Sequence, residues 1–384
     1  SMGLTVFPTI IINSGSSDTD STASGAGPAT AITGTCAAST NTTTVTFNGN
    51  PDLSGVAQDG SHVLLVDGAG GGYNRISTVN DAANTCVVET AMTITASAAF
   101  AIGGKIPSIN GTNARKLFAT TTGPSTSFGA SGQWIISLET DDSINSAIPL
   151  TATAGTGWIE IKSSVEGTTR IITQSANAYH FTPSTATKWR FSDLQFLNSN
   201  GTPLEVFSVS TATCIVTMRR CICGSNSGTS CPRGLVVRPS GSMTLNMLDC
   251  AILRCTVAGC SAAINASFYN CDISRNSGVG VGLGGGTLVM YNCIVSFNTG
   301  GGISSSSSPV LFGNTIHGNT GDGLVDNLAT NTASIIVNNQ FTKNSGWGIN
   351  FSSTQPHIFI CEYNNFGNAS DSTNNTSGTG TGFT

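Results

Sequence analysis

The chain has 384 residues and a mass of 39.1 kDa, and only 9% of its residues are charged, against about 25% in an average soluble domain. Its net charge of −5 excludes a broadly basic surface, so we expect no nucleic acid partner. Because 39% of the residues are hydrophobic, the chain has enough apolar side chains to fold. There is no run of 18 apolar residues and no recognisable signal peptide, so we expect no membrane span.

The N-terminal part of the chain is expected to form separate pieces ahead of the main fold. Residues 1–30 contain an apolar strand and then a linker rich in Ser, Gly, Asp and Thr. Residues 31–106 hold short runs of β-branched and aromatic residues separated by turn residues, which predicts a small β domain. This domain either attaches the protein to a larger particle or caps the fold that follows, and both roles stay open.

Residues 107–368 are expected to form one long β structure. Its early part carries Trp134, Trp158 and Trp189, whose spacings of 24 and 31 residues fit one tryptophan per structural turn. Residues 369–384 form a polar tail of low complexity, which we expect to be disordered or paired with another chain.

A four-fold repeat dominates the region from residue 269 to residue 349. Each copy contains Asn-(Ser/Thr)-Gly-x-Gly followed by Val, Ile or Leu, and the steps between the core asparagines are 22, 21 and 25 residues. These asparagines are Asn276, Asn298, Asn319 and Asn344. A period of this length indicates stacked units that cannot bury a face alone. The Gly, Ser, Thr and Asn content with β-branched residues between them favours short strands and tight turns.

Aligning the repeats gives columns of equivalent positions, and strand alternation assigns their faces. We expect four mainly apolar or small columns to face the interior. The first is Leu248, Tyr269, Tyr291, Phe312 and Val337; the second is Cys221, Cys250, Cys271, Cys293, Asn314 and Asn339; the third is Cys223, Ile252, Ile273, Val295, Ile316 and Phe341; the fourth is Cys231, Cys260, Val281, Ile303, Leu324 and Ile349.

A further column lies at a bend, where stacked amides can satisfy one another from repeat to repeat. It consists of Asn226, Cys255, Asn276, Asn298, Asn319 and Asn344. The glycines two and four residues later let the backbone turn sharply. These columns predict an all-β solenoid whose strands stack about 4.8 Å apart.

This pattern resembles the right-handed parallel β-helix proteins, the pectate-lyase-like group, and especially the phage tailspike β-helix proteins. The resemblance covers roughly residues 115–368. It implies a right-handed parallel β-helix preceded by a small N-terminal β domain. It also implies association as a homotrimer and polysaccharide binding on the outward face of one sheet.

The chain has 12 cysteines, and most of them fall on the interior columns. We interpret them as small buried hydrophobic residues. A disulfide between Cys250 and Cys271 is geometrically allowed, but a whole column of disulfides is not, because each sulfur pairs once. The cysteine spacings do not match zinc sites. Free interior thiols favour folding in a reducing cytoplasm.

Two outward carboxylates are candidates for catalysis. Asp249 and Asp272 lie one repeat apart, with an expected Cα separation of about 8 Å, which would suit an inverting acid and base pair. Arg220 is expected to stack over Asp249, either as part of a substrate-facing row or as a surface ion pair.

Trp347 beside Asp322 is a candidate sugar platform, and with Arg220 completes the carbohydrate-binding candidates. The alternative for Trp347 is a single surface aromatic residue. We interpret His317 as a lone surface histidine. The resemblance implies calcium in the lyases, but no outward cluster of three aspartates is present, so we expect no metal and no cofactor.

Our leading hypothesis is a structural or adhesion protein of a tailed phage, a spike, fibre or capsid-decorating protein, located in the virion and in contact with a cell-surface polysaccharide or virion proteins. The alternative is a polysaccharide lyase or glycoside hydrolase on the same scaffold. A second alternative is a bacterial secreted surface protein, which would be extracellular. Fold class does not choose among these.

Overall fold

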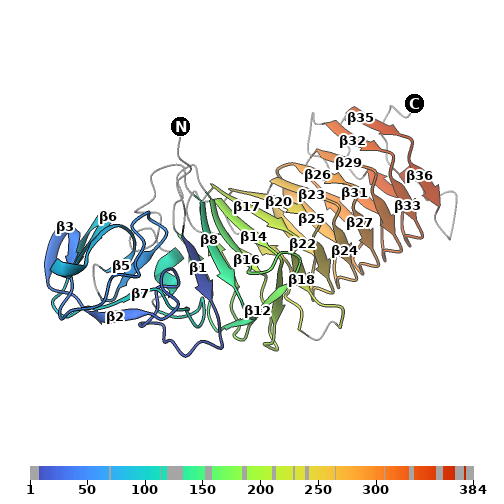
Figure 1. Ribbon diagram of the computed structural model, residues 1–384. Coiled ribbons are helices and arrows are strands. Elements are labelled where there is room, and N and C mark those ends of the chain that lie inside the picture. Colours follow the sequence, from blue (N-terminus) through green and yellow to red (C-terminus); the bar gives the residue numbers. More distant parts are fainter. Residues whose placement is uncertain are drawn as a thin grey trace. The chain divides into compact units, whose positions relative to one another are not determined.

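The computed structural model divides into two compact units, Ser1–Ile172 with Pro183–Ser192, and Thr173–Thr182 with Asp193–Thr384 (Figure 1). The structure describes residues 8–68, 71–112, 114–118, 133–151, 158–183, 188–209, 213–227, 230–237, 242–263, 265–306, 308–327, 333–351, 358–367 and 376–377. Most of the tail predicted at 369–384 therefore lies outside the described residues, as do residues 1–7. The domain boundaries predicted from the sequence stay predictions.

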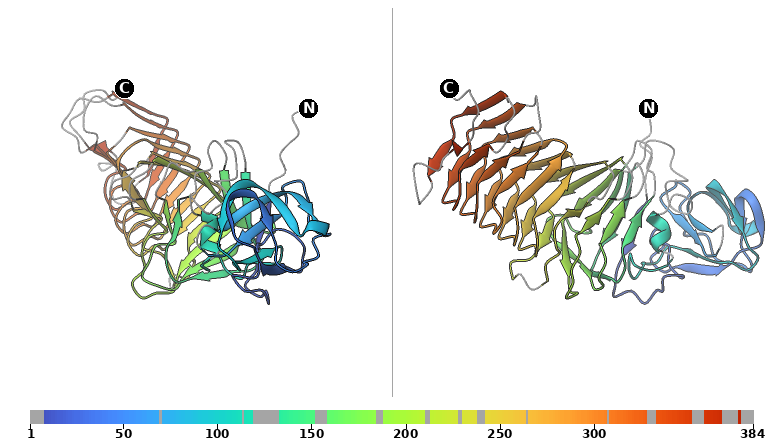
Figure 2. Two further views of the ribbon diagram at one scale, coloured as in Figure 1. Left: turned by 90° about the vertical axis from the view of Figure 1, so that its left-hand side faces the viewer. Right: turned by 180° about the vertical axis from the view of Figure 1, so that it is seen from behind.

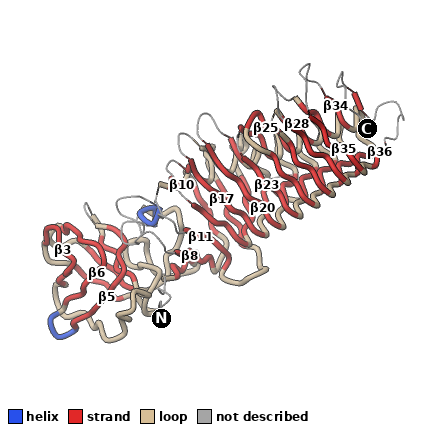
Figure 3. The backbone as a smooth tube through the Cα atoms, turned by 90° about the horizontal axis from the view of Figure 1, so that it is seen from above, coloured by secondary structure: helices blue, strands red, loops and turns tan. Residues whose placement is uncertain are grey.

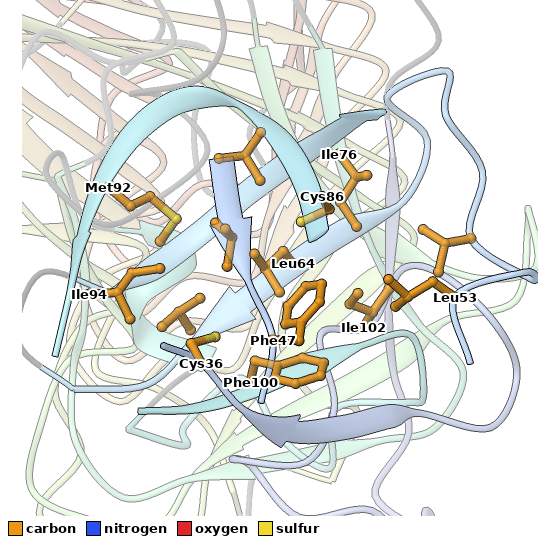
Figure 4. Close-up of a cluster of buried hydrophobic side chains, with 14 residues drawn as sticks. Cys36, Phe47, Leu53, Leu64, Ile76, Cys86, Met92, Ile94, Phe100 and Ile102 are labelled. Carbon is orange, nitrogen blue, oxygen red and sulfur yellow. The ribbon is translucent and has the colours of Figure 1, made fainter. Parts of the chain in front are cut away.

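The first unit contains the expected small N-terminal β domain, which is an antiparallel sheet with strand order β2-β7-β4-β5-β6-β3. The strands are β2 (Ile32–Thr35), β3 (Ser39–Thr46), β4 (Val63–Val66), β5 (Gly72–Asn80), β6 (Thr85–Ile94) and β7 (Ala99–Ile102). A 3₁₀ turn, η1 (Asp81–Ala83), joins β5 to β6. The sheet encloses its own apolar core, in which the Phe47 and Phe100 rings pack with centroids 4.2 Å apart (Figure 4).

The first unit also contains parallel strands. These are β1 (Thr9–Ile12), β8 (Gln133–Leu138), β11 (Trp158–Ser163) and β14 (Lys188–Ser192), in that order in the sheet. Shorter elements accompany them: η2 (Ala114–Phe118), β9 (Asp142–Ile144), β10 (Ile148–Leu150) and β12 (Arg170–Gln174). Trp134, Trp158 and Trp189 lie on β8, β11 and β14, so each of these turns has one tryptophan, as expected. Only Trp134 and Trp189 are buried, at positions that both align with Ile159. Trp158 aligns with Gln133 and is half-buried.

The second unit is a parallel β-solenoid, in which each turn, or rung, contributes one strand to each sheet (Figures 2 and 3). Its first sheet consists of β17 (Thr213–Arg219), β20 (Ser242–Leu248), β23 (Asn265–Tyr269), β26 (Leu288–Tyr291), β29 (Pro309–Phe312), β32 (Ala333–Val337) and β35 (Ile358–Glu362). Its second sheet consists of β15 (Leu194–Asn198), β18 (Ile222–Gly224), β21 (Ala251–Leu253), β24 (Asp272–Ser274), β27 (Ile294–Ser296), β30 (Thr315–His317), β33 (Gln340–Thr342) and β36 (Asn365–Gly367).

The third side of the solenoid holds the remaining strands. Earlier rungs supply β13 (Phe181–Pro183), β16 (Phe207–Ser208) and β19 (Val236–Val237). Later rungs supply β22 (Cys260–Ala263), β25 (Val281–Gly285), β28 (Ile303–Ser305), β31 (Leu324–Asp326), β34 (Ile349–Phe351) and β37 (Thr376–Ser377). No α-helix occurs among the described residues, so the predicted all-β class is confirmed.

Two sharp bends border the second sheet, and at each bend one residue per rung adopts positive φ. The first bend precedes the sheet and contains Asp193, Arg220, Asp249, Asn270, Asn292, Gly313, Asn338 and Tyr363. The second bend follows the sheet and contains Arg254, Arg275, Phe297, Gly318 and Lys343. A left-handed residue reverses the chain direction locally, so strand alternation does not continue through it.

The first bend explains why one predicted interior column is wrong. Leu248, Tyr269, Tyr291 and Phe312 end the strands of the first sheet, and their side chains are exposed rather than interior. Alternation would put Tyr291 and Cys293 on one face, but Asn292 between them has a φ of 53°. The other three interior columns are confirmed as buried.

The predicted asparagine ladder is present just after the second bend. The Oδ1 of Asn298 accepts the backbone N–H and the Nδ2 of Asn276, at 3.0 and 2.8 Å. Asn298 in turn donates through the same two groups to Asn319, both at 3.0 Å, and Asn319 does so to Asn344. All four side chains are buried. They therefore provide hydrogen-bond partners for backbone groups that would otherwise be unpaired in the core.

The prediction for the first rung of the asparagine column is wrong. Asn226 is exposed rather than stacked in the ladder. In its rung the positive φ falls at Gly224, so the turn begins earlier than at the later rungs. Cys255 does lie in the ladder, where its backbone N–H donates to Asn276 Oδ1 at 2.9 Å.

A second ladder follows the first bend and changes from cysteine to asparagine along the solenoid. Cys271 N–H donates to Cys293 Sγ at 3.5 Å, and Cys293 N–H donates to Asn314 Oδ1 at 2.8 Å. The Cys293 thiol donates to Phe268 O, and one rung further Asn314 Nδ2 donates to Met290 O, which is the aligned carbonyl. The thiol therefore makes the same two contacts as the amide, only longer.

All 12 cysteines are free, and all but Cys361 are buried. Burial raises the pKa of the Cys260 thiol to about 12, so this thiol is protonated at neutral pH. The possible disulfide between Cys250 and Cys271 is not formed. In its place the Cys250 thiol donates to Leu248 O at 3.1 Å.

The equivalence of thiol and amide predicts the outcome of substitutions at Cys293. Cys293→Asn should stay within about 1 kcal/mol of the wild-type free energy of unfolding, because it extends the asparagine ladder by one rung. Cys293→Ala should lower the free energy of unfolding by about 1–3 kcal/mol more than Cys214→Ala does. Only Cys293→Ala removes the acceptor of the buried Cys271 N–H. Urea unfolding measures both. Equal losses for the two alanine variants would contradict a bonding role for the thiol.

Candidate functional site

The candidate site lies on the outward side of the second sheet, together with its two bends; we call this region the outer face. In each three-residue strand from β21 to β33 the middle side chain points into the core, and its two neighbours point outward. In β24 Ile273 is buried in the core and Asp272 is half-buried on the outward side. Ser274 alternates with Ile273 and so is also on the outward side, but it is only 3% exposed. The outer face therefore repeats its side-chain positions at every rung.

Large exposed hydrophobic side chains gather on the outer face. Ile294 is 49% exposed in the middle of it, and Phe297 is 50% exposed at the second bend. Leu248, Tyr269, Tyr291 and Phe312 are exposed where the first sheet meets the first bend. Apolar groups concentrated in this way are typical of a binding surface.

An aromatic column runs along the first bend. The Tyr269 and Tyr291 rings are parallel within 1°, with centroids 5.5 Å apart, and Phe312 follows at 5.9 Å with a tilt of 40°. Beside it, Asn292 Nδ2 donates to Asn270 Oδ1 at 2.8 Å, and Asn270 Nδ2 donates to Asp249 Oδ1 at 3.2 Å. Because the facing sides of the two tyrosine rings cover each other, a ligand would meet ring edges, hydroxyls and amides.

Arg220 does not pair with Asp249 as one reading of the sequence suggested. Its Nε and Nη2 donate to the two carboxylate oxygens of Asp193, at 2.6 and 2.8 Å. The Asp193 side chain is only 4% exposed, so this two-pronged ion pair bridges the first two rungs of the bend in a partly dry setting. The Arg220 guanidinium is thus bonded to Asp193, where it stabilises the fold, and its role in carbohydrate binding stays a prediction.

The two candidate catalytic carboxylates occupy different parts of the outer face. Asp249 is exposed at the first bend, whereas Asp272 lies outward on β24, aligned with Ala251. No hydrogen bond joins their side chains in the described part of the chain. Asp272 Oδ1 is buried and has no hydrogen-bond partner there. A catalytic role for this pair stays a prediction.

Asp322 and Trp347 are brought together, but through the backbone of Trp347. Asp322 Oδ1 accepts the Trp347 N–H at 2.6 Å, and Oδ2 accepts Asn350 Nδ2 at 2.8 Å. Gly346 is required here, since a Cβ on it would lie 2.2 Å from Asp322 Oδ1. The carboxylate therefore stabilises the turn before β34 through these two hydrogen bonds. The Trp347 side chain is half-buried. Sugar binding at this pair stays a prediction.

His317 is half-buried on β30 rather than isolated on the surface. Its Nδ1 lies 2.8 Å from Thr342 Oγ1, and its ring meets Phe297 edge-on at 5.3 Å. Sequence reasoning missed Phe297. A usable signal was its position directly before a ladder asparagine, which is the bend position in every repeat.

Other kinds of site find less support. Within the described ranges, no group of three or more His, Cys, Asp and Glu side chains is placed to hold a metal ion. Nor does that part of the chain contain a helix with the length and hydrophobicity to cross a membrane.

Comparison with known proteins agrees with the fold. Residues 233–384 match the family model described as a right handed beta helix region. The parallel solenoid and this match together show the fold of a right-handed parallel β-helix, as the repeat predicted. No curated protein matches the chain.

The geometry of Arg220 predicts a structural role for it. Asp193→Asn should lower the free energy of unfolding by about 2–4 kcal/mol, because it removes one partner of a largely buried ion pair while keeping a side chain that tolerates positive φ. The matched control is Asp249→Asn, at an exposed position of the same bend. This variant should change the free energy of unfolding by less than about 0.5 kcal/mol. Chemical denaturation distinguishes them, and similar midpoints would show that the ion pair contributes little.

Proposed function

We propose that the protein is a structural and adhesion protein that binds a cell-surface polysaccharide along the outer face. The aromatic column and its neighbouring amide row carry this proposal. The Tyr269 and Tyr291 rungs offer ring edges, hydroxyls and amides, and the Phe312 rung adds a further ring edge. The rung spacing of about 4.8 Å is close to the length of one sugar unit in an extended chain. Repeated weak contacts then add up along a polymer.

We further propose a tailed-phage virion as its location and a homotrimer as its assembly. Two observations support the virion. A small antiparallel domain precedes the solenoid, as in the spike proteins that the sequence resembles. The 12 free thiols suit folding in a reducing cytoplasm, where virions assemble. The bacterial secreted surface protein is the competing proposal for the same adhesive role.

A polysaccharide lyase or glycoside hydrolase is the second candidate, and Asp272 is the observation that favours it. Its buried oxygen without a hydrogen-bond partner, beside an exposed patch, is the kind of group that a substrate hydroxyl could engage. Cleavage of a bacterial polysaccharide that is lost in both Asp249→Asn and Asp272→Asn would establish this activity.

Polysaccharide binding is tested by surface plasmon resonance on a panel of bacterial capsule and outer-membrane polysaccharides. The wild type should bind at least one of them. Tyr291→Ala should weaken that binding about tenfold or more, which corresponds to about 1.4 kcal/mol, because it removes the central ring of the column.

Val257→Ala is the matched control, since Val257 is 45% exposed but lies beyond the second bend, and its binding should be unchanged. Binding to no member of the panel, or equal binding by Tyr291→Ala and the wild type, would contradict the proposal.

A further inference from the structure

Two buried thiols in the second unit bond only to each other among the described residues. Cys223 lies in the middle of β18, and Cys255 lies one rung further on, at the ladder position after the second bend. Their Sγ atoms are 3.6 Å apart, and both side chains are fully buried. Within the described part of the chain neither sulfur makes another hydrogen bond. The two thiols therefore have no bonding role toward the backbone.

The stacked cysteines of the second ladder are used differently. The Cys250 thiol donates to Leu248 O at 3.1 Å, and its sulfur accepts the Cys221 N–H at 3.4 Å. Oxidation of such a thiol removes a hydrogen-bond donor from the core, which is costly for the buried backbone group that loses its partner. Oxidation of the pair in β18 and the next rung removes no bond to the backbone. The structure therefore singles out this pair among the interior thiols.

The pair lies where the asparagine ladder stops. The Asn276 side chain accepts the Cys255 N–H at 2.9 Å and donates to Asn298 Oδ1 at 2.8 Å, so it joins its rung to both neighbours. The Cys255 thiol contacts Cys223 instead, and Asn226 in the preceding rung is exposed. At this bend the rungs of β18 and β21 thus have no ladder hydrogen bond among the described residues.

The backbone brings these two rungs close together beside the pair. Gly224 follows Cys223 at a φ of 94°, and a Cβ on it would collide with the Leu253 carbonyl oxygen. Gly224 and Leu253 are aligned in the second sheet. A bond between two sulfurs is about 2.05 Å long, so the Sγ atoms of the pair must approach by about 1.5 Å. Small rotations of two short side chains cover this distance.

We propose that Cys223 and Cys255 are a redox site that closes into a disulfide when the protein meets hydrogen peroxide. One sulfur, as the thiolate, attacks a peroxide oxygen, and the O–O bond breaks to give a sulfenic acid. The other sulfur attacks the sulfenic sulfur, so that the S–S bond forms and the S–O bond breaks. The two thiols lose two electrons and two protons, and one peroxide leaves as two water molecules. This inference goes beyond the proposed adhesive role and does not depend on it.

The disulfide takes the place of the missing ladder bond. It joins the rungs of β18 and β21 at the bend, and it constrains the unfolded chain between residues 223 and 255, which stabilises the folded state. Because the pair closes after folding, the protein folds with free thiols and gains this link when it reaches an oxidising medium.

Burial controls how fast the site reacts. Burial and the neighbouring Cys255, Cys231 and Cys260 thiols raise the pKa of the Cys223 thiol well above its ordinary value, so this thiol is protonated at neutral pH. The nucleophilic thiolate therefore forms when the neighbouring turn opens, and residues 226–227 of that turn are exposed. Oxidation is expected to be slow and to follow this local opening.

Peptide mapping of the wild-type protein tests the site without any substitution. The protein is incubated with hydrogen peroxide, and the remaining thiols are alkylated under denaturing conditions. Trypsin then cleaves after Arg220, Arg233, Arg254 and Arg275. We expect a disulfide-linked pair of peptides, 221–233 with 255–275, which dithiothreitol separates. The half-buried Cys361 is the internal control, since its oxidation shows that the peroxide has acted.

Single substitutions identify the two cysteines within the linked peptides. Cys223→Ala and Cys255→Ala should each abolish the link. Cys231→Ala and Cys260→Ala are the matched controls, because they remove thiols from the same two peptides, and both should keep the link. Differential scanning calorimetry of the wild type should show a melting temperature about 4 °C or more higher after oxidation, and dithiothreitol should reverse this rise.

Four results would overturn the redox site. The first is a protein whose Cys223 and Cys255 are both still alkylated when Cys361 is oxidised. The second is a link between peptides 221–233 and 234–254, which indicates a bond within the second ladder instead. The third is a link that survives in Cys223→Ala, and the fourth is a linked wild type whose melting temperature is unchanged.

Discussion

The second unit depends on one repeated device: a residue at positive φ followed by a buried side chain that bonds to the next rung. At the second bend this side chain is an asparagine, as in Asn276, Asn298 and Asn319, whose amides accept and donate along the solenoid. A sharp bend leaves backbone groups without strand partners, and in a core these are costly. The ladder satisfies them, so the solenoid can turn twice per rung without large loops.

The same device determines what the outer surface presents. Because each bend breaks strand alternation, Tyr269 and Tyr291 face outward although they lie two residues before interior cysteines. Most of the bend residues are at least partly exposed, and Asp193, which pairs with Arg220, is the buried exception. The first bend uses them mainly for amides and an ion pair, and the second for cations and Phe297. Fold stability and surface chemistry thus come from neighbouring positions of one repeat.

The sequence predicted the architecture because the ladder asparagines and the core columns recur in phase, and Ile273, Val295 and Ile316 are buried as expected. It failed where the backbone conformation at one residue decides the outcome. Alternation counted through Asn292 placed Tyr291 inside, since positive φ leaves little trace in composition. It also failed for contacts between distant residues: the Asp193 partner of Arg220 lies 27 residues away, and the sequence favours no such pair over others.

Native-state hydrogen exchange with residue resolution tests the ladder most directly. The backbone N–H groups of Asn276, Asn298 and Asn319 donate to the next asparagine side chain rather than to a strand. If the ladder holds the solenoid together, they should be among the slowest to exchange, with an opening free energy equal to that of global unfolding. If these amides exchange well before those of β24 and β27, the hydrogen bonds between strands hold the rungs together and the asparagine ladder contributes little to stability.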